Sequence, residues 1–159
     1  MQYKRYLLLG ALLLLTLAWG CAEGSTTIAP PEIRYGEDLC TECNMVISDP
    51  RFAAAYVYEV GEGRYRSLAF DDIGDLLVHM AKHPEHTTVA WYVHDYQSAE
   101  WLDATTAYYV VGEQIRTPMN HGIAAHATEA NAIAMAANLA GEVMDWAALL
   151  QRCSENSEL

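Results

Sequence analysis

The stretch Tyr65-Arg66-Ser67-Leu68-Ala69-Phe70-Asp71-Asp72-Ile73-Gly74, residues 65–74, passes directly from a predicted strand into a predicted helix. Residues 65–70 form the strand, and the paired aspartates that follow are suited to cap the helix N-terminus. Apolar residues then recur at the spacing of one helix face, at Ile73, Leu76, Leu77 and Met80. We expect this helix to end at His83-Pro84, because proline does not continue a helix.

Strands are predicted on both sides of this strand–helix unit. Residues 52–60 are rich in apolar, β-branched and aromatic side chains, and Gly61-Glu62-Gly63 is a turn signal before the strand at 65–70. Residues 87–94 form a further strand after the helix. The first half of the chain therefore has the predicted order strand, strand, helix, strand.

The second half of the chain repeats this order. Strands are expected at 107–111 and 122–127, and an alanine-rich helix follows at 128–140, with Thr128 as its cap and a glycine as its stop. Residues 143–147 are the predicted closing strand. The sequence therefore predicts an α+β fold in which two ββαβ units pack together.

The predicted folded domain covers residues 38–152. Its two ββαβ units span about 51–98 and 104–148, and a polar tail is expected at 153–159.

The N-terminal residues are typical of an exported lipoprotein. A basic pair precedes an apolar run at 7–17, which is shorter than the roughly 20 residues that span a bilayer. Leu17-Ala18-Trp19-Gly20-Cys21 resembles a bacterial lipobox, which predicts removal of a signal peptide at 1–20 and lipid attachment to Cys21. Ordinary cleavage or an uncleaved anchor is the alternative. We expect 21–37 to be a flexible tether that holds the domain at a membrane, facing the periplasm or the cell exterior.

The mature chain is strongly acidic. Residues 1–20 contain Lys4 and Arg5 but no acidic residue, so their removal changes the formal net charge from −12 to −14. A surface of that charge repels nucleic acid, which excludes DNA and RNA as partners. It suits cations or a basic protein partner, and it is equally compatible with a role in solubility alone.

Sulfur ligands are concentrated in Asp38-Leu39-Cys40-Thr41-Glu42-Cys43-Asn44-Met45. Soft thiolate and thioether ligands select Cu(I) over hard ions such as magnesium. Cys43 and Met45 are one residue apart, so in an extended segment their side chains would point the same way. Met119, on a loop fixed by Pro118, would close the site from the second unit. Cys40 and His121 are further candidate ligands, and the alternative for His121 is a position on the loop without a metal.

Several segments, in order, resemble the NosL family, the copper-binding accessory lipoproteins of nitrous oxide reductase assembly. The resemblance rests on Cys40-Thr41-Glu42-Cys43-Asn44-Met45-Val46-Ile47-Ser48-Asp49-Pro50-Arg51-Phe52-Ala53-Ala54, Phe70-Asp71-Asp72-Ile73-Gly74, Val93-His94-Asp95-Tyr96, Trp101-Leu102-Asp103-Ala104 and Thr117-Pro118-Met119. It implies a duplicated ββαβ fold related to organomercurial lyase, and a lipid anchor. It also implies Cu(I) delivery to the reductase through its membrane transporter complex.

The same resemblance implies Cys43, Met45 and Met119 as the copper ligands. Many members have only the second of the two thiols, so Cys40 does not carry over in the same way. The family commonly has glycine directly after the Pro-Met pair, whereas this chain has Asn120-His121-Gly122.

Two other readings of the cysteines remain open. Cys40 and Cys43 have the spacing of a redox pair, which makes a thiol–disulfide protein the alternative function. A scaffolding lipoprotein without chemistry of its own is a second alternative. No nucleophile elbow, phosphate-binding loop or metalloprotease motif is present, and we expect no enzyme activity.

Three histidines lie close together in sequence around the end of the first predicted helix, at His79, His83 and His86. They are candidates for a weak divalent-metal site. With Lys82 and Pro84 among them, a solvated helix end is the favoured interpretation.

Overall fold

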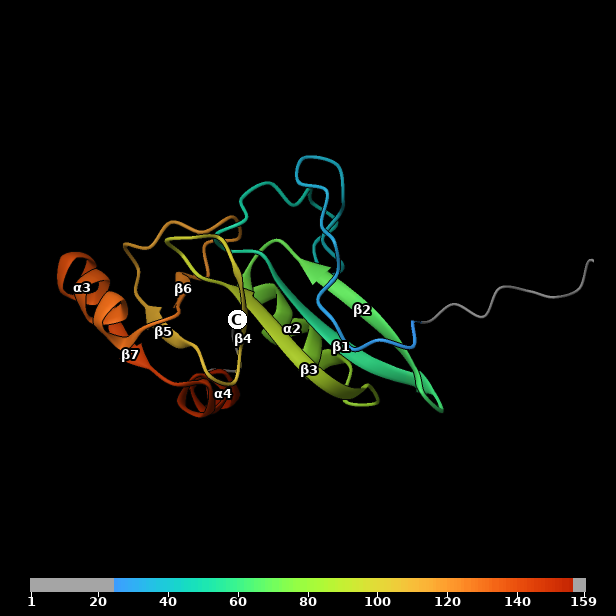
Figure 1. The fold of residues 1–159 in the computed structure, drawn as a ribbon. Coiled ribbons are helices and arrows are strands. Elements are labelled where there is room, and N and C mark those ends of the chain that lie inside the picture. The colour runs from blue at the N-terminus through green and yellow to red at the C-terminus, as the bar shows by residue number, and fades with distance from the viewer. Residues whose placement is uncertain (1–24, 156–159) are drawn as a thin grey trace, which may run out of the picture.

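The computed structural model describes residues 25–155, which fold into two antiparallel sheets and three helices (Figure 1). The first sheet has the strand order β2-β1-β3-β4. Its elements are β1 (Ala54–Gly61), β2 (Arg64–Phe70), helix α2 (Ile73–Lys82), β3 (Thr87–His94) and β4 (Trp101–Asp103).

The second sheet is smaller and has the strand order β6-β5-β7. Its elements are β5 (Tyr108–Val111), β6 (Ile123–His126), helix α3 (Glu129–Leu139), β7 (Glu142–Met144) and helix α4 (Trp146–Glu155). In both sheets the first strand of the unit is central, with the second and third strands antiparallel on its two sides. The predicted duplicated ββαβ fold is therefore confirmed.

The two predicted helix caps are present. The side chain of Asp72 accepts a hydrogen bond from the Gly74 backbone N–H at 2.9 Å, and Thr128 accepts one from the Asn131 N–H at 3.3 Å. Each cap satisfies a backbone donor that has no partner within its own helix. Helix α3 ends at Leu139, and its C-cap, Ala140, has a left-handed backbone (φ 50°) immediately before the glycine that the sequence marks as the stop.

The C-terminal prediction is wrong in two respects. The strand expected at 143–147 ends at Met144, and α4 begins at Trp146, so the polar tail expected from residue 153 is helical as far as Glu155. The side chain of Asp145 accepts a hydrogen bond from the Ala148 N–H at 2.8 Å, which starts the helix. Trp146 and Leu149 then bury one face of α4 in the main core, which favours a helix over a continued strand.

Strand β4 was not predicted. It pairs with the edge strand β3 and extends the first unit beyond the expected boundary near residue 98. Its short length explains the omission, because a run of three residues carries little periodicity.

The two units are joined by backbone pairing and by a shared core. The Tyr96 N–H donates to the Ala125 carbonyl at 2.8 Å, and the Asp95 side chain accepts from the Ala127 N–H at 2.9 Å. Core residues of α4 pack in the same apolar cluster as Tyr56 and Phe70 of the first sheet. Side-chain contacts of Asp72 and Asp75 also hold the start of α2 against the loop between β5 and β6.

The predicted signal peptide (1–20) and the predicted lipid attachment at Cys21 lie outside the described residues. Within residues 25–155 no helix has the length and apolar character needed to cross a membrane.

The buried hydroxyl of Tyr109 provides a test of the connection between the units. It donates to the Ala104 carbonyl at 2.7 Å, just after β4. Tyr109→Phe leaves that buried carbonyl without its partner, so we expect a loss of about 1–3 kcal/mol in the free energy of unfolding. Urea denaturation followed by circular dichroism measures the loss. Tyr108→Phe is the matched control, because the Tyr108 side chain is partly exposed, and equal effects of both changes would contradict the prediction.

Candidate metal centre

The sulfur-bearing segment forms a tight turn. The Cys40 N–H donates to the Met45 carbonyl at 2.8 Å, and the Asn44 N–H donates to the Cys40 carbonyl at 3.0 Å. Asn44 closes the turn with a left-handed backbone (φ 60°), a conformation that asparagine tolerates better than most residues. The extended segment that would align Cys43 with Met45 is therefore absent, and that part of the prediction is wrong.

The three sulfur-bearing side chains of the turn differ in their exposure to solvent. Cys40 is buried, with 1% of its surface exposed, and Cys43 is half-buried. Met45 is 53% exposed and stands at the end of the turn beside the exposed Leu39 and Val46. The turn thus presents one sheltered thiol, one intermediate thiol and one accessible thioether.

Both thiols meet the carboxylate of Asp75, in the first turn of α2. The Cys40 Sγ donates to Asp75 Oδ2 at 3.2 Å. One ligand atom each from Cys40, Cys43 and Asp75 lie within 4.8 Å of one another, and both thiols are free. This is a compact group of possible metal ligands.

The electrostatics of this group keep the thiols protonated. Burial raises the pKa of Cys43 to about 12, and its hydrogen bond to Asp75 adds to the effect. Burial likewise raises the pKa of Cys40. Burial opposes ionisation of Asp75, but hydrogen bonds from His121 and both thiols hold its pKa below the ordinary value. Any metal ion that binds these thiols as thiolates must displace their protons.

The loop that carries Met119 is attached to the cap of α2. Asp72 Oδ2 accepts from the Thr117 hydroxyl at 2.5 Å and from the Met119 N–H at 3.0 Å. The other oxygen of the same carboxylate caps α2. The structure therefore brings Met119 of the second unit to the helix start where Asp75 meets the cysteines.

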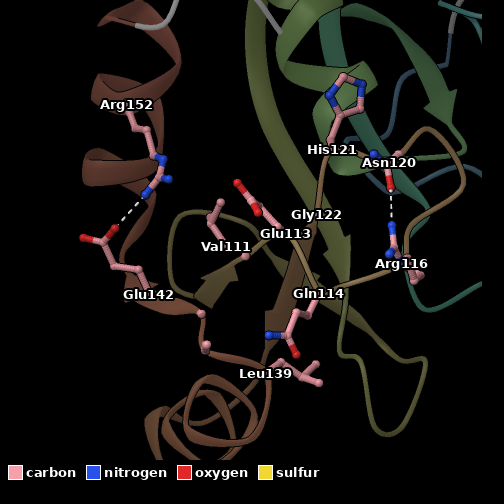
Figure 2. A pocket seen from close by; sticks show the side chains of 13 residues that line it. Val111, Glu113, Gln114, Arg116, Asn120, His121, Gly122, Leu139, Glu142 and Arg152 are labelled. Atoms are coloured by element: carbon pink, nitrogen blue, oxygen red, sulfur yellow. Dashed lines mark hydrogen bonds and ion pairs between the residues drawn. The ribbon is translucent and has the colours of Figure 1, made fainter.

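His121 reaches the same place through a gap left by a glycine. Its Nε2 lies 3.2 Å from Asp75 Oδ1, and this contact raises the pKa of His121. A Cβ on Gly74 would lie only 2.1 Å from Cγ of His121, so any other residue at position 74 would displace the ring. Figure 2 shows the imidazole lying toward α2.

A separate cavity of about 1260 Å³ borders the other side of this loop (Figure 2). Its lining is largely polar: Arg116 donates to Asn120 at 3.3 Å, and Arg152 donates to Glu142 at 2.6 Å. No cysteine or methionine lines it. The sulfur ligands are therefore gathered outside this cavity, at the start of α2.

Of the residues proposed from sequence, Cys40, Cys43 and His121 meet at Asp75, and Met119 lies on the loop held by Asp72. Met45 is at the exposed end of the turn. Their action as ligands stays a prediction.

Sequence reasoning missed Asp75 altogether and assigned Asp72 to capping alone. The available signal was an excess of acidic residues around the start of α2, at 71, 72 and 75, where a cap needs only one.

Three comparisons with known proteins identify the family and the fold. The sequence pattern of the NosL family matches residues 33–153. A protein of Stutzerimonas stutzeri named copper-binding lipoprotein NosL is 31% identical over 151 residues, which cover 85% of this chain and 76% of that protein. The crystal structure of the copper chaperone NosL from Shewanella denitrificans has a TM-score of 0.63 at 20% identity, over 76% of this chain and 94% of that chain. The last likeness shows the common fold.

Asp75→Asn tests the electrostatic account of the thiols. Removal of the carboxylate charge should lower the pKa of Cys43 from about 12, although burial will keep it above the ordinary value. Ultraviolet thiolate absorbance as a function of pH measures the change. Asp49→Asn is the control, because Asp49 pairs with Arg51 and makes no contact with the thiols. An unchanged titration in Asp75→Asn would contradict the account.

Proposed function

This chain belongs to the NosL family, and on that premise we propose that it is a Cu(I) metallochaperone, anchored by lipid at Cys21 outside the cytosol. It binds copper and delivers it for assembly of a copper centre, that of nitrous oxide reductase. The observation that carries the proposal is the meeting of two free thiols and the Met119 loop at the start of α2. The printed names of the matched relatives support copper as the cargo.

The proposed ligands are Cys43, Met45 and Met119, with Cys40 and His121 as further candidates. Cu(I) is a soft closed-shell ion that accepts few ligands, and thiolate with thioether suits it. A thiolate holds the ion tightly, whereas a neutral thioether leaves more easily. A mixed set therefore both retains copper and allows its release.

Asp75 has a positioning role in loading. It is ionised and accepts a hydrogen bond from Cys40 at 3.2 Å. When a thiol sulfur bonds to copper it loses its proton, and this carboxylate is the nearest acceptor. The proton then passes to solvent, so the step consumes no other reactant.

Release begins at the exposed end of the site. Met45 stands with Leu39, which is 56% exposed, and Val46 on an apolar rim that an acceptor can cover. A sulfur ligand of the acceptor replaces one thioether at a time, so the coordination number of copper never falls far. The acceptor is the reductase, reached through its membrane transporter complex, and the acidic surface favours a partner with basic residues at the contact.

The alternative, a thiol–disulfide protein that uses Cys40 and Cys43, has less support. A redox-active cysteine needs a lowered pKa to form its thiolate at neutral pH. In this protein burial raises the pKa of both thiols. The proposed role is accordingly binding and transfer, without enzyme activity.

An anaerobic Cu(I) titration of the intact, reduced protein against a competing chelator tests the ligand set. We expect one copper per chain, with the largest loss of affinity in Cys43→Ser and a loss of about tenfold, or about 1.4 kcal/mol, in Met45→Leu and in Met119→Leu. Met144→Leu in β7 is the control for loss of a methionine elsewhere.

Two outcomes of that titration would count against the proposal. Loss in Cys43→Ser with unchanged affinity in both methionine variants would indicate a general thiol and favour the redox alternative. Absence of competitive binding by the fully reduced wild type would exclude the copper site.

The affinity should also depend on pH. Because the pKa of Cys43 lies near 12, its proton must be displaced throughout the neutral range, so Cu(I) affinity should rise with pH. For each thiolate formed we expect about a tenfold gain per pH unit between about pH 6 and 8. The same competition assay, corrected for the chelator, measures the slope. A flat profile would show that no thiol proton is displaced.

A further inference from the structure

Three histidines form a second group of possible ligands at the other end of α2. His79 lies on the helix, His83 follows its last residue, and His86 lies in the turn before β3. One nitrogen from each ring lies within 4.8 Å of a nitrogen from each of the others. The fold has therefore collected three imidazoles in one place.

Each ring is held by a hydrogen bond on the same nitrogen, Nδ1. The partners are Glu42 Oε2 for His79 at 2.8 Å, Glu85 Oε1 for His83 at 2.9 Å and the Tyr56 hydroxyl for His86 at 2.6 Å. Among residues 25–155, Nε2 of these rings has no hydrogen-bond partner. Histidines that bind metals commonly have this arrangement, with one nitrogen oriented by a carboxylate or similar group and the other left for the ion.

The burial of the three histidines indicates that the fold holds them in place. His79 is 7% exposed and packs against Tyr56 and Phe70, with ring centroids 6.1 and 5.3 Å apart, so the solvated helix end expected from sequence is wrong for this residue. His83 and His86 are half-exposed, and their rings stack with centroids 5.1 Å apart. One ligand is thus fixed by the core, and two lie at the surface where an ion can enter.

We propose that His79, His83 and His86 form a second metal site, which takes a divalent transition ion of the Cu(II) and Zn(II) class. Neutral imidazole suits these ions, whereas soft sulfur suits Cu(I), and Cu(II) should bind most tightly. Ligand nitrogens at about 2.0–2.1 Å from an ion lie about 3.3 Å apart in tetrahedral geometry. The three ligand nitrogens lie within 4.8 Å of one another, and rotation of the half-exposed rings of His83 and His86 would bring them to that spacing. The site does not depend on copper being held by the cysteines.

The histidine cluster and the cysteine turn are connected through one residue. Glu42, whose carboxylate holds His79 and also pairs with Lys82, lies in the turn between Cys40 and Cys43. An ion on the histidines would fix the orientation of His79 and with it the position of Glu42. The two sites are distinct in their donors but contact the same turn.

Cu(II) titration of the intact protein, in a Cys40→Ser/Cys43→Ser background, tests the proposal. The background prevents the thiols of the turn from binding or reducing the ion. We expect one tight Cu(II) per chain, with nitrogen hyperfine structure in its electron paramagnetic resonance spectrum. His83→Ala and His86→Ala should each weaken binding by at least about tenfold. Both residues are half-exposed, so these changes are less disruptive than replacement of the buried His79.

His126→Gln is the matched control and should leave Cu(II) binding unchanged, because His126 lies in β6, outside the histidine cluster and outside the proposed sulfur site. Equal affinity in the wild-type cluster and in His83→Ala/His86→Ala would overturn the proposal, as would a spectrum without nitrogen coupling. In the chain with native cysteines, His83→Ala should retain Cu(I) affinity, which separates failure of this site from failure of the sulfur site or of folding.

Discussion

The carboxylate of Asp72 is the contact on which the proposed sulfur site depends. One oxygen caps α2, and the other holds the Thr117 hydroxyl and the Met119 N–H. A single side chain therefore fixes both the start of a helix in the first unit and a loop of the second. The helix start in turn sets the place of Asp75, where the cysteine turn meets His121. Together with the contact between His121 and Asp75, this carboxylate holds the Met119 loop of the second unit beside the cysteine turn of the first.

The candidate site is asymmetric although the ββαβ unit is duplicated. The two units have the same topology, but only α2 receives a ligand-bearing turn before it and a loop from the other unit. Helix α3 starts with the same kind of cap at Thr128, yet no cysteine lies near it in sequence. The proposed chemistry thus arises from the segments added to a repeated scaffold, and the scaffold supplies their relative position.

The sequence predicts local structure well and long-range contacts poorly. Caps and apolar periodicity located α2 and α3, because these signals lie within a few residues. The left-handed Asn44 belongs to a local turn without apolar periodicity, and the helix that begins at Trp146 depends on core contacts that periodicity does not contain. The contact between His121 and Asp75 joins residues 46 positions apart and needs Gly74 to make room. It becomes visible only when the two units are packed.

The exposure of Met45 makes its thioether vulnerable to oxidation in the proposed location outside the cytosol. An accessible thioether is open to oxidants, and its sulfoxide is a polar group with a weakened affinity for soft metals. Cys40, buried beside Asp75, is sheltered from the same attack. Under the proposed function, the sulfur atom that would release copper first is therefore the one most exposed to oxidation. A chaperone with this proposed ligand set would depend on methionine sulfoxide reduction, or on bound metal that occupies the sulfur, to keep its affinity for copper.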